Sequence, residues 1–238
     1  MKIALIGYGR MGHEVERMAA GMGHEITHHF DVGQEWSGRV PLPGVQVVID
    51  FSTAEAVIDH AVAAAALGIP LVEGTTGWQS RRQELATIPN LTMIYSANFS
   101  IGVYRFQQVV KLAGQLYGRL GVYDTYVHEW HHTGKADSPS GTALSLANAL
   151  VEVLPNKSEL LATASAGKIA PSALHVSSTR VGRVPGTHEV GFDSQYDQIT
   201  IRHQAFGRDA FAFGAVRAAE WIRGKTGVFT MDDFMADQ

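Results

Sequence analysis

The first part of the chain constrains its fold more than any other stretch of the sequence. Residues Lys2–Ile6 form a short, mostly apolar run of the kind that becomes a buried strand. They lead directly into Gly7-Tyr-Gly9-Arg-Met-Gly12, and residues 13–23 follow with helical spacing of apolar residues. A strand, a glycine-rich turn and a helix in this order begin a βαβ unit, so we expect a parallel sheet.

The glycine-rich turn indicates a dinucleotide-binding site. Gly7 permits a tight turn, Gly9 lets the backbone approach a pyrophosphate, and Gly12 allows the helix to pack closely on the strand. A G-x-G-x-x-G pattern alone is a weak signal, but its position between a strand and a helix makes it specific. We therefore expect the whole loop, including Tyr8, Arg10 and Met11, to bind the cofactor.

An acidic residue follows the second predicted strand. Residues 25–30 end at Asp31, about twenty positions beyond the loop, where a carboxylate can bond the ribose hydroxyls. A carboxylate there disfavours the extra phosphate of NADPH, so NADH is the favoured cofactor. Two possibilities stay open, because Asp31 could instead be a solvated turn residue and Arg10 or Arg39 could receive a phosphate.

Strands and helices continue to alternate up to residue 99. We expect strands at 45–51, 69–73 and 91–95, and helices at 52–67 and 80–86, the first with a capping box from Ser52 to Glu55. In parallel sheets ligands bind at the carboxyl ends of the strands. The segments expected at those ends are residues 7–12, 31, 74–77 and 96–99.

The pattern changes beyond residue 99. A long amphipathic helix at 101–120 is followed by a strand at 121–128 and a helix at 142–154, and later by strands at 174–180, 188–192 and 198–204. These strands predict a second domain with an open antiparallel or mixed sheet. Residues 157–169 are polar and small, which indicates an irregular connection, and a last helix is expected at 208–224.

The stretch 129–143 concentrates chemically active residues. It reads Glu129-Trp-His131-His132-Thr-Gly-Lys135-Ala-Asp-Ser-Pro-Ser140-Gly141-Thr142-Ala143, and we place it on a loop between a strand and a helix. Ser140 is the expected N-cap, which leaves the N–H groups of Gly141 and Thr142 directed at an anion such as a carboxylate. His131 can exchange a proton near neutral pH, and Lys135 can pair with a carboxylate or act as an acid. The arrangement suits an anionic substrate that must be protonated.

Composition excludes several other classes of function. The net charge of −4 argues against nucleic acid as a partner, and the absence of cysteine excludes disulfides, thiolate nucleophiles and cysteine metal sites. The nearby histidines His128, His131 and His132 lack the helical spacing of a zinc site, so we expect no metal. No apolar run is long enough for a membrane span and no export signal is evident, so we expect a cytoplasmic protein.

The stretch 129–143 also resembles a known signature. The pattern Glu-x-His-His-x-x-Lys-x-Asp-x-Pro-Ser-Gly-Thr-Ala is similar to that of the 4-hydroxy-tetrahydrodipicolinate reductase (dihydrodipicolinate reductase) family. The resemblance implies NAD(P)H-dependent reduction of 4-hydroxy-tetrahydrodipicolinate to tetrahydrodipicolinate in the diaminopimelate route to lysine. It implies that His131 is the acid/base and Lys135 the proton donor. It also implies that the dicarboxylate substrate is held by His132, Ser140, Gly141 and Thr142.

The resemblance extends to cofactor contacts. Segments similar to the family's Gly-Thr-Thr-Gly and Ala-Asn-Phe-Ser stand here, with Ser96 where an alanine is more usual, and the glycine loop is one residue tighter than in some members. The residues implied as contacts are Gly74, Thr75, Thr76, Ser96, Ala97, Asn98 and Phe99. Arg180 lies in a segment similar to the family's Val-Arg-x-Gly, where a substrate contact and a structural salt bridge are both open.

The resemblance also implies an architecture. A Rossmann-like parallel-sheet dinucleotide-binding domain would comprise residues 1–99 and 207–238. An α+β domain with an open mixed sheet, residues 100–206, would bind substrate and form a homotetramer. Closure at hinges near 99–100 and 206–207 would complete the site.

Two other functions remain as alternatives. One is a two-domain dehydrogenase for an amino or sugar substrate, but such enzymes lack the His-His-x-x-Lys and Pro-Ser-Gly-Thr combination. The other is a non-catalytic NAD-sensing protein of the same fold, which has no need of His131 or Lys135.

Overall fold

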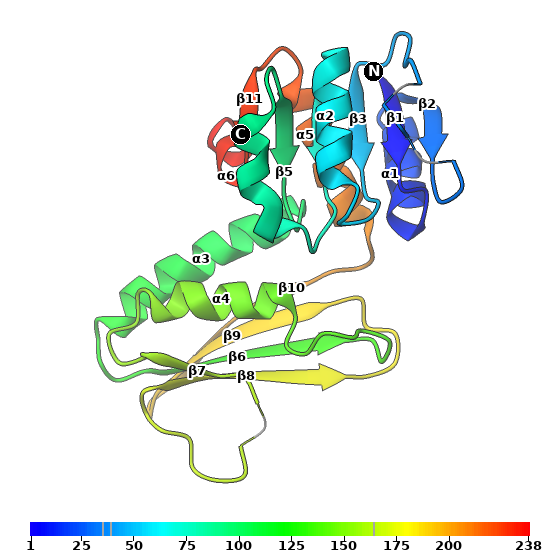
Figure 1. The fold of residues 1–238 in the computed structure, drawn as a ribbon. Helices are drawn as coiled ribbons and strands as arrows, with labels where there is room; N and C mark the ends of the chain where they lie inside the picture. Colours follow the sequence, from blue (N-terminus) through cyan, green and yellow to red (C-terminus); the bar gives the residue numbers. More distant parts are fainter. Residues whose placement is uncertain (35, 39, 164) are drawn as a thin grey trace. The chain divides into compact units, whose positions relative to one another are not determined.

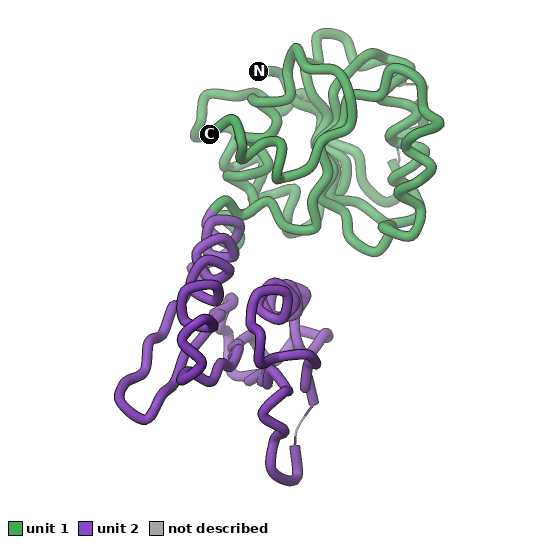
Figure 2. The backbone as a smooth tube through the Cα atoms, turned by 90° about the vertical axis from the view of Figure 1, so that its left-hand side faces the viewer, with its two compact units in different colours: residues 1–101, 208–238 green, residues 102–207 purple. Residues whose placement is uncertain are grey.

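The computed structural model describes residues 1–34, 36–38, 40–163 and 165–238. The chain divides into two compact units, which Figure 2 shows in different colours. The first comprises residues Met1–Ile101 and Arg208–Gln238, and the second comprises Gly102–Gly207. Two segments distant in sequence therefore build the first unit.

The first unit contains a six-stranded parallel sheet. Its strands are β1 (Lys2–Ile6), β2 (Glu25–Phe30), β3 (Val47–Asp50), β4 (Leu71–Glu73), β5 (Thr92–Tyr95) and β11 (Gly227–Phe229). They lie in the order β11-β5-β4-β3-β1-β2, and every neighbouring pair is parallel. The direction of strand succession reverses at β1, which has β2 on one side and β3 on the other. Such a reversal point opens a crevice at the carboxyl ends of the strands.

Helices cover both faces of this sheet (Figure 1). They are α1 (Arg10–Gly21), α2 (Val57–Leu67), α5 (Asp209–Ile222) and the short α6 (Met231–Ala236), with the 3₁₀-helix η1 at Gln79–Thr87. Helices α1 and α5 pack together, whereas α2 lies on the other face over a core that includes Ala4, Val48 and Leu71. The expectation of a Rossmann-like parallel sheet is confirmed.

One local expectation in this unit is wrong, and a second is met with a different type of helix. Helix α2 begins at Val57 with Ala56 as N-cap, so the capping box from Ser52 to Glu55 does not form. The reason is a competing acceptor, because the Ser52 N–H donates to Asp50 Oδ1 at 2.8 Å and holds the chain in a turn. The helix expected at 80–86 is the 3₁₀-helix η1.

The second unit contains a five-stranded mixed sheet covered on one face. Its strands are β6 (Asp124–His131), β7 (Glu159–Leu161), β8 (Ala173–Arg180), β9 (Thr187–Asp193) and β10 (Gln198–Gln204), in the order β10-β9-β6-β8-β7. Pairs β6/β8 and β7/β8 are parallel, and pairs β6/β9 and β9/β10 are antiparallel. Helices α3 (Ile101–Gly118) and α4 (Gly141–Val151) lie on one face, which Figure 1 shows. The expected mixed sheet is confirmed.

Strand β6 extends farther than the sequence suggested. It continues to His131, because its parallel pairing with β8 reaches the pair His131 and Arg180 and the His131 carbonyl accepts from Val181 N–H at 2.8 Å. Glu129 and His131 therefore lie on a strand and not on the loop. Their side chains are buried on the helix-covered face, whereas Trp130 between them is on the other face.

The segment expected to be irregular is partly ordered. Strand β7 lies inside it and pairs with β8. Lys157 is buried, and its Nζ donates to the carbonyls of Pro171 and Ala173, both at 2.9 Å, and pairs with Asp124. The buried ammonium group of Lys157, bonded to backbone carbonyls, holds both ends of the segment. The polar composition of the segment gave no indication of this contact.

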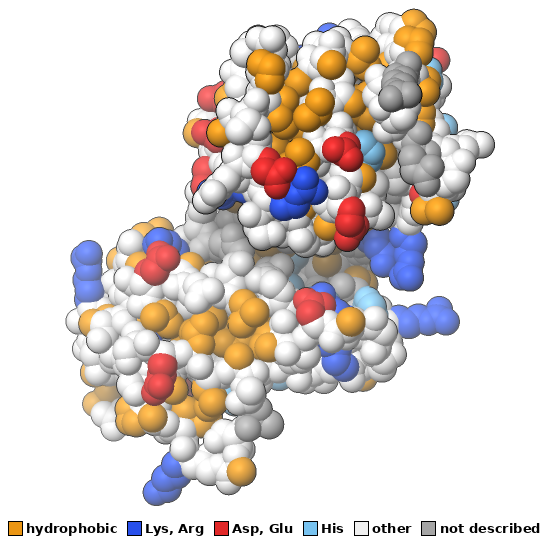
Figure 3. All heavy atoms as spheres, viewed as in Figure 1, with side chains coloured by type: hydrophobic (Ala, Val, Ile, Leu, Met, Phe, Trp, Pro, Cys, Tyr) orange, Lys and Arg blue, Asp and Glu red, His pale blue; other side chains and the backbone are white. Residues whose placement is uncertain are grey.

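The surface is typical of a globular protein. On the face shown in Figure 3, hydrophobic side chains lie among polar and charged ones in both units. Across the described residues, every helix is too short or too polar to cross a lipid bilayer.

Candidate active site

A buried carboxylate lies at the centre of the site in the second unit. Glu129 on β6 is fully buried, and its Oε1 accepts hydrogen bonds from Ser140 N–H at 2.9 Å and Ser178 Oγ at 2.8 Å. Arg180 Nη2 donates to the same oxygen at 2.8 Å. Burial by itself raises the pKa of Glu129, but hydrogen bonds from His188, Ser140, Arg180 and Ser178 bring it well below its usual range. Glu129 is therefore ionised.

His131 lies against the second oxygen of this carboxylate. Its Nδ1 is 3.2 Å from Glu129 Oε2. Burial lowers the pKa of His131 to about 4, because the attraction of Glu129 is outweighed by burial and by the positive potential of His188, Lys135 and Arg180. His131 is thus neutral at pH 7, in contrast to the titration near neutrality expected from its ordinary pKa. A bound anion would oppose that positive potential and raise this pKa.

Gly186 makes room for the imidazole of His131. It lies in the turn between β8 and β9 with φ of 153°, and a Cβ there would be 3.0 Å from His131 Nε2. A side chain at this position would press on the His131 ring.

The start of α4 is built as predicted, with one difference. Ser140 is the N-cap and its Oγ accepts from Ala143 N–H at 3.2 Å. The Gly141 N–H, expected to be unpaired, instead bonds the carboxylate of Asp137 and helps to lower its pKa. Burial raises that pKa, and the hydrogen bond from Lys135 is the largest effect that lowers it. An internal carboxylate therefore holds the position that an anionic ligand would take.

The loop after β6 carries the remaining predicted residues. The His132 carbonyl accepts from Lys135 N–H at 3.1 Å, so residues 132–135 form a turn. Lys135 Nζ is 2.6 Å from Asp137 Oδ1, with about a quarter of the side chain exposed. Lys135 and Gly141 thus both bond the carboxylate of Asp137. His131 and Ser140 both lie beside Glu129. Thr142 follows in the first turn of α4.

The site also contains residues that sequence reasoning missed or left open. His188 on β9 is the cross-strand partner of Glu129, and its Nε2 lies 3.2 Å from Ser140 Oγ and 3.6 Å from Glu129 Oε2. Arg180 forms a salt bridge with Glu129 and also donates to the Asp137 carbonyl at 2.6 Å. Of the two roles left open for Arg180, the structure shows the structural salt bridge. The pairing register of the strands, which the sequence does not reveal, brings His188 here.

Three of these side chains have the composition of a metal site. Ligand atoms of Glu129, His131 and His188 lie within 4.8 Å of one another. Among the described residues, Glu129 Oε2 and His131 Nδ1 have no hydrogen-bond partner of good geometry. The guanidinium of Arg180 bonds the other oxygen of Glu129, so the buried charge of Glu129 has a counter-charge within the chain.

The glycine loop of the first unit is open on one side and tightly packed on the others. A Cβ at Gly7 would overlap the Phe51 carbonyl oxygen, and one at Gly12 would overlap the Gly7 carbonyl oxygen. A Cβ at Gly9 would meet nothing within 4 Å, and Gly9 is the N-cap of α1 without a side-chain cap. This is the geometry of a loop that leaves its helix N-terminus accessible to an anion. Tyr8 lies in the same loop, and Arg10 and Met11 are the first residues of α1.

The other predicted cofactor residues lie at the same edge of the parallel sheet. Exposed Asp31 follows β2, residues 74–76 follow β4 and residues 96–99 follow β5. Ser96 and Asn98 fix their own turn, since Ser96 Oγ donates to the Asn98 carbonyl at 2.8 Å. Phe99 is 1% exposed, so its side chain serves packing. Arg39, an alternative phosphate contact, lies outside the described residues.

Comparison with known proteins gives a consistent result. Residues 102–235 match the family model "Dihydrodipicolinate reductase, C-terminus" and residues 39–99 match "Dihydrodipicolinate reductase, N-terminus". The chain is 37% identical to 4-hydroxy-tetrahydrodipicolinate reductase of Christiangramia forsetii, over 100% of this chain and 98% of that protein. It is 38% identical to the reductase of Archaeoglobus fulgidus, over 99% and 100%. A dipicolinate-bound dihydrodipicolinate reductase from Paenisporosarcina sp. TG-14 has a similar fold, with TM-score 0.73 and 21% identity over 97% of each chain.

The role of Glu129 can be tested by the substitution Glu129→Gln. We expect the free energy of unfolding to fall by about 3 kcal/mol, because Arg180 loses its buried counter-charge. The depressed pKa of Glu129 means that its carboxylate stabilises the fold above about pH 4 and that this contribution is lost on acidification. The variant should therefore show a flatter acid limb when urea unfolding is measured from pH 3 to pH 7.

The matched control is Glu152→Gln, which removes an exposed carboxylate paired with Lys111. It should change the free energy of unfolding by less than about 1 kcal/mol. Equal stability of the Glu129→Gln variant and the wild type at pH 7 would contradict the central role of this carboxylate.

Proposed function

The chain belongs to the dihydrodipicolinate reductase family, and from this membership and the geometry around Glu129 we propose how its residues act. It is an oxidoreductase that uses NAD(P)H to reduce 4-hydroxy-tetrahydrodipicolinate in the diaminopimelate route to lysine. The observation that carries the assignment of roles is the Glu129 network, which fixes His131 and the Ser140 N-cap in one buried cluster beside the loop of Lys135.

Lys135 is the proton donor. The bound nicotinamide supplies a hydride, which leaves negative charge on the substrate, so a proton must be delivered in step. Lys135 is an ammonium group on a partly exposed loop. Among the described residues, its Nζ is hydrogen-bonded only to Asp137, whose side chain is exposed. It can therefore release Asp137 and approach a substrate without disturbing the core.

His131 supports the same step as an acid/base. It is neutral in the ligand-free site, with a pKa lowered to about 4. A dianionic substrate raises that pKa and allows the imidazole to take a proton. Glu129 stabilises the imidazolium that results, and its bond to Arg180 keeps the carboxylate in place.

The substrate carboxylates bind at His132, Ser140, Gly141 and Thr142. The Asp137 carboxylate, which bonds Lys135 and Gly141, occupies the place of one of them. A substrate carboxylate replaces one anion by another and so preserves the charge balance of the loop. The Paenisporosarcina reductase has dipicolinate bound, a planar dicarboxylate, which supports this class of ligand.

The cofactor binds at the carboxyl edge of the first sheet, and NADH is favoured over NADPH. The accessible start of α1 receives the pyrophosphate and Asp31 the adenosine ribose. Segments 74–76 and 96–99 complete the site. The first unit is thus the cofactor-binding domain and the second the substrate-binding domain. We place the protein in the cytoplasm, where NADH is available.

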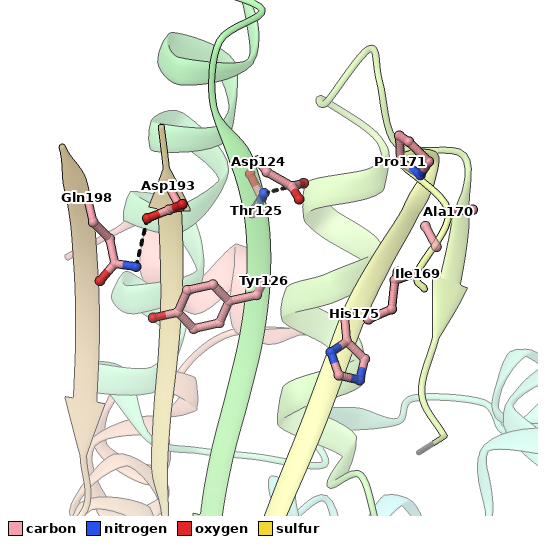
Figure 4. Close-up of a pocket in the computed structure, with 10 residues that line it drawn as sticks. Asp124, Thr125, Tyr126, Ile169, Ala170, Pro171, His175, Asp193 and Gln198 are labelled. Atoms are coloured by element: carbon pink, nitrogen blue, oxygen red, sulfur yellow. Dashed lines mark hydrogen bonds between the residues drawn. The ribbon is translucent and has the colours of Figure 1, made fainter. Parts of the chain in front are cut away.

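A homotetramer formed through the second unit completes the proposal. The outer face of its sheet, opposite α3 and α4, carries the half-buried side chains of Tyr126 and His175. Figure 4 shows them at a pocket of about 490 Å³, beside a segment that includes Ile169 and Pro171. A sheet face with aromatic side chains and no helix layer suits another copy of the same face.

The catalytic roles predict the behaviour of Lys135→Ala and His131→Gln. Both variants should lose about 100-fold or more in kcat, because each lacks a proton-transfer group. Both should still bind NADH with nearly unchanged Kd. The measurements are NADH oxidation, with substrate generated in situ by the preceding synthase, and a fluorescence titration with NADH.

Lys111→Ala is the control, since it removes an exposed lysine of α3 in the same unit. Its kcat should equal that of the wild type. Full activity of Lys135→Ala would show that the proton comes from another group.

The cofactor preference is tested by Asp31→Ser. Loss of the carboxylate should raise kcat/KM for NADPH relative to NADH by about tenfold, which corresponds to about 1.4 kcal/mol. Glu25→Gln, at the other end of β2, is the control and should leave the ratio unchanged. An unchanged ratio for Asp31→Ser would place ribose recognition elsewhere.

The assembly is tested by light scattering after gel filtration. The wild type should have four times the 25.7 kDa mass of one chain. His175→Glu places four like charges at the proposed interface and should give smaller species that retain their secondary structure by circular dichroism. A monomeric wild type would refute the interface.

A further inference from the structure

The first unit contains a buried cluster of titratable groups that the reaction does not use. Asp50 is the last residue of β3 and Glu73 the last of β4, and the two are register partners in the parallel sheet. His60 reaches them from α2. The exposed fractions of Asp50, His60 and Glu73 are 0%, 5% and 0%. Burying charged groups is costly, so their arrangement requires a physical reason.

Each carboxyl group holds the turn that follows its own strand. Asp50 Oδ1 accepts from Ser52 N–H at 2.8 Å, and Asp50 Oδ2 lies 2.6 Å from His60 Nδ1. Glu73 Oε1 accepts from Thr75 N–H at 2.6 Å. Glu73 Oε2 is buried and has no hydrogen-bond partner among the described residues. Asp50, the register partner of Glu73, is the neighbouring charged group that acts on its pKa. The cluster thus connects two adjacent strand ends.

The surroundings of Glu73 favour its neutral form. His60 is bonded to Asp50 and not to Glu73. Burial and the neighbouring Asp50 carboxylate therefore raise the pKa of Glu73 well above its ordinary value, although the bonds from Thr75 oppose this. Tyr95 is the register partner of Glu73 on β5, and Arg82 lies 5.9 Å from the Tyr95 ring centroid.

The turn held by Glu73 is the one between β4 and η1. Trp78, which is buried, donates from Nε1 to the Thr75 carbonyl at 2.9 Å. A Cβ at Gly74 would overlap the ring of Phe51, whose carbonyl oxygen lies against Gly7. Consecutive contacts therefore connect Glu73, through this turn, to Phe51 and the glycine loop.

We propose that Glu73 is a positioning residue for the cofactor, and that as a neutral acid paired with Asp50 it holds the 74–76 turn through the Thr75 N–H. Loss of its proton would put a second negative charge beside Asp50. We expect this repulsion to outweigh the stronger bond that an ionised Glu73 makes to Thr75 N–H and to displace the turn, so cofactor affinity falls as the pH rises. The proposal rests on the proposed contact of residues 74–76 with the cofactor. The proposal assigns a structural role to a buried proton that no step of the reaction consumes.

Two substitutions separate the neutral acid from a merely space-filling residue. Glu73→Gln keeps an oxygen for Thr75 N–H and an N–H donor for Asp50, and it cannot ionise. Glu73→Leu fills a similar volume but leaves Thr75 N–H without its acceptor. Asp59→Asn is the matched control, because it removes an exposed carboxylate from the residue next to His60 on the same helix.

The experiment is a fluorescence titration of the full-length variants with NADH from pH 6 to pH 9, together with kcat at saturating NADH. For the wild type and Asp59→Asn, the Kd should rise about tenfold over this range, equivalent to about 1.4 kcal/mol. Glu73→Gln should bind as tightly as the wild type at pH 6 and show no rise. Glu73→Leu should bind about tenfold more weakly at every pH, with kcat unchanged for all four proteins.

Each result has a definite meaning. A rise in Kd with pH that persists in Glu73→Gln overturns the inference, because the titrating group is then another residue. A pH-independent Kd in the wild type overturns it as well. If the wild type oxidises NADH and Glu73→Leu retains full affinity for NADH, the role of Glu73 is refuted. The proposed function is then intact. Failure of the wild type to bind NADH would refute the cofactor site itself.

Discussion

The second unit depends on one buried negative charge. The Glu129 carboxylate receives donors from α4 through Ser140 and from β8 through Ser178 and Arg180, while it lies beside His188 of β9. An unpaired carboxylate in this position would cost several kcal/mol. Because its hydrogen bonds come from separate elements, the charge is tolerated only when all of them are in place. The site and the fold of this unit therefore form together.

The same charge determines which groups of the site carry protons. Glu129 attracts a proton to His131, but burial and the cationic Lys135 and Arg180 outweigh it, so the imidazole is neutral without a ligand. The ligand-free loop then has an ammonium group balanced by Asp137. In the proposed mechanism, a dicarboxylate replaces Asp137 and adds negative charge beside His131, which reverses this balance. Substrate binding would then prepare the acid for the reaction.

Most of the framework could be predicted from local sequence. The glycine loop, the parallel strands and the Ser140 N-cap depend on neighbouring residues, and the structure contains all three. The errors arise from contacts that the local pattern does not reveal, one between near neighbours and one between distant strands. Asp50 captures Ser52 N–H and shifts the start of α2, and the pairing of β6 with β8 extends β6 to His131. His188 reaches Glu129 only through strand register, for which the sequence of β9 contains no signal.

The two units show how the surroundings of a buried glutamate decide its ionisation. Glu129 is bonded to a guanidinium and its pKa is depressed, whereas Glu73 faces another carboxyl group and its pKa is raised. Both accept a hydrogen bond from the backbone N–H of a loop near the proposed ligands, Ser140 in one case and Thr75 in the other. In the proposed mechanism the ionised glutamate orients groups that move protons, so its charge would have to persist throughout the cycle. The neutral glutamate holds a turn in place, and a second negative charge there would oppose the fold and the binding of an anionic cofactor.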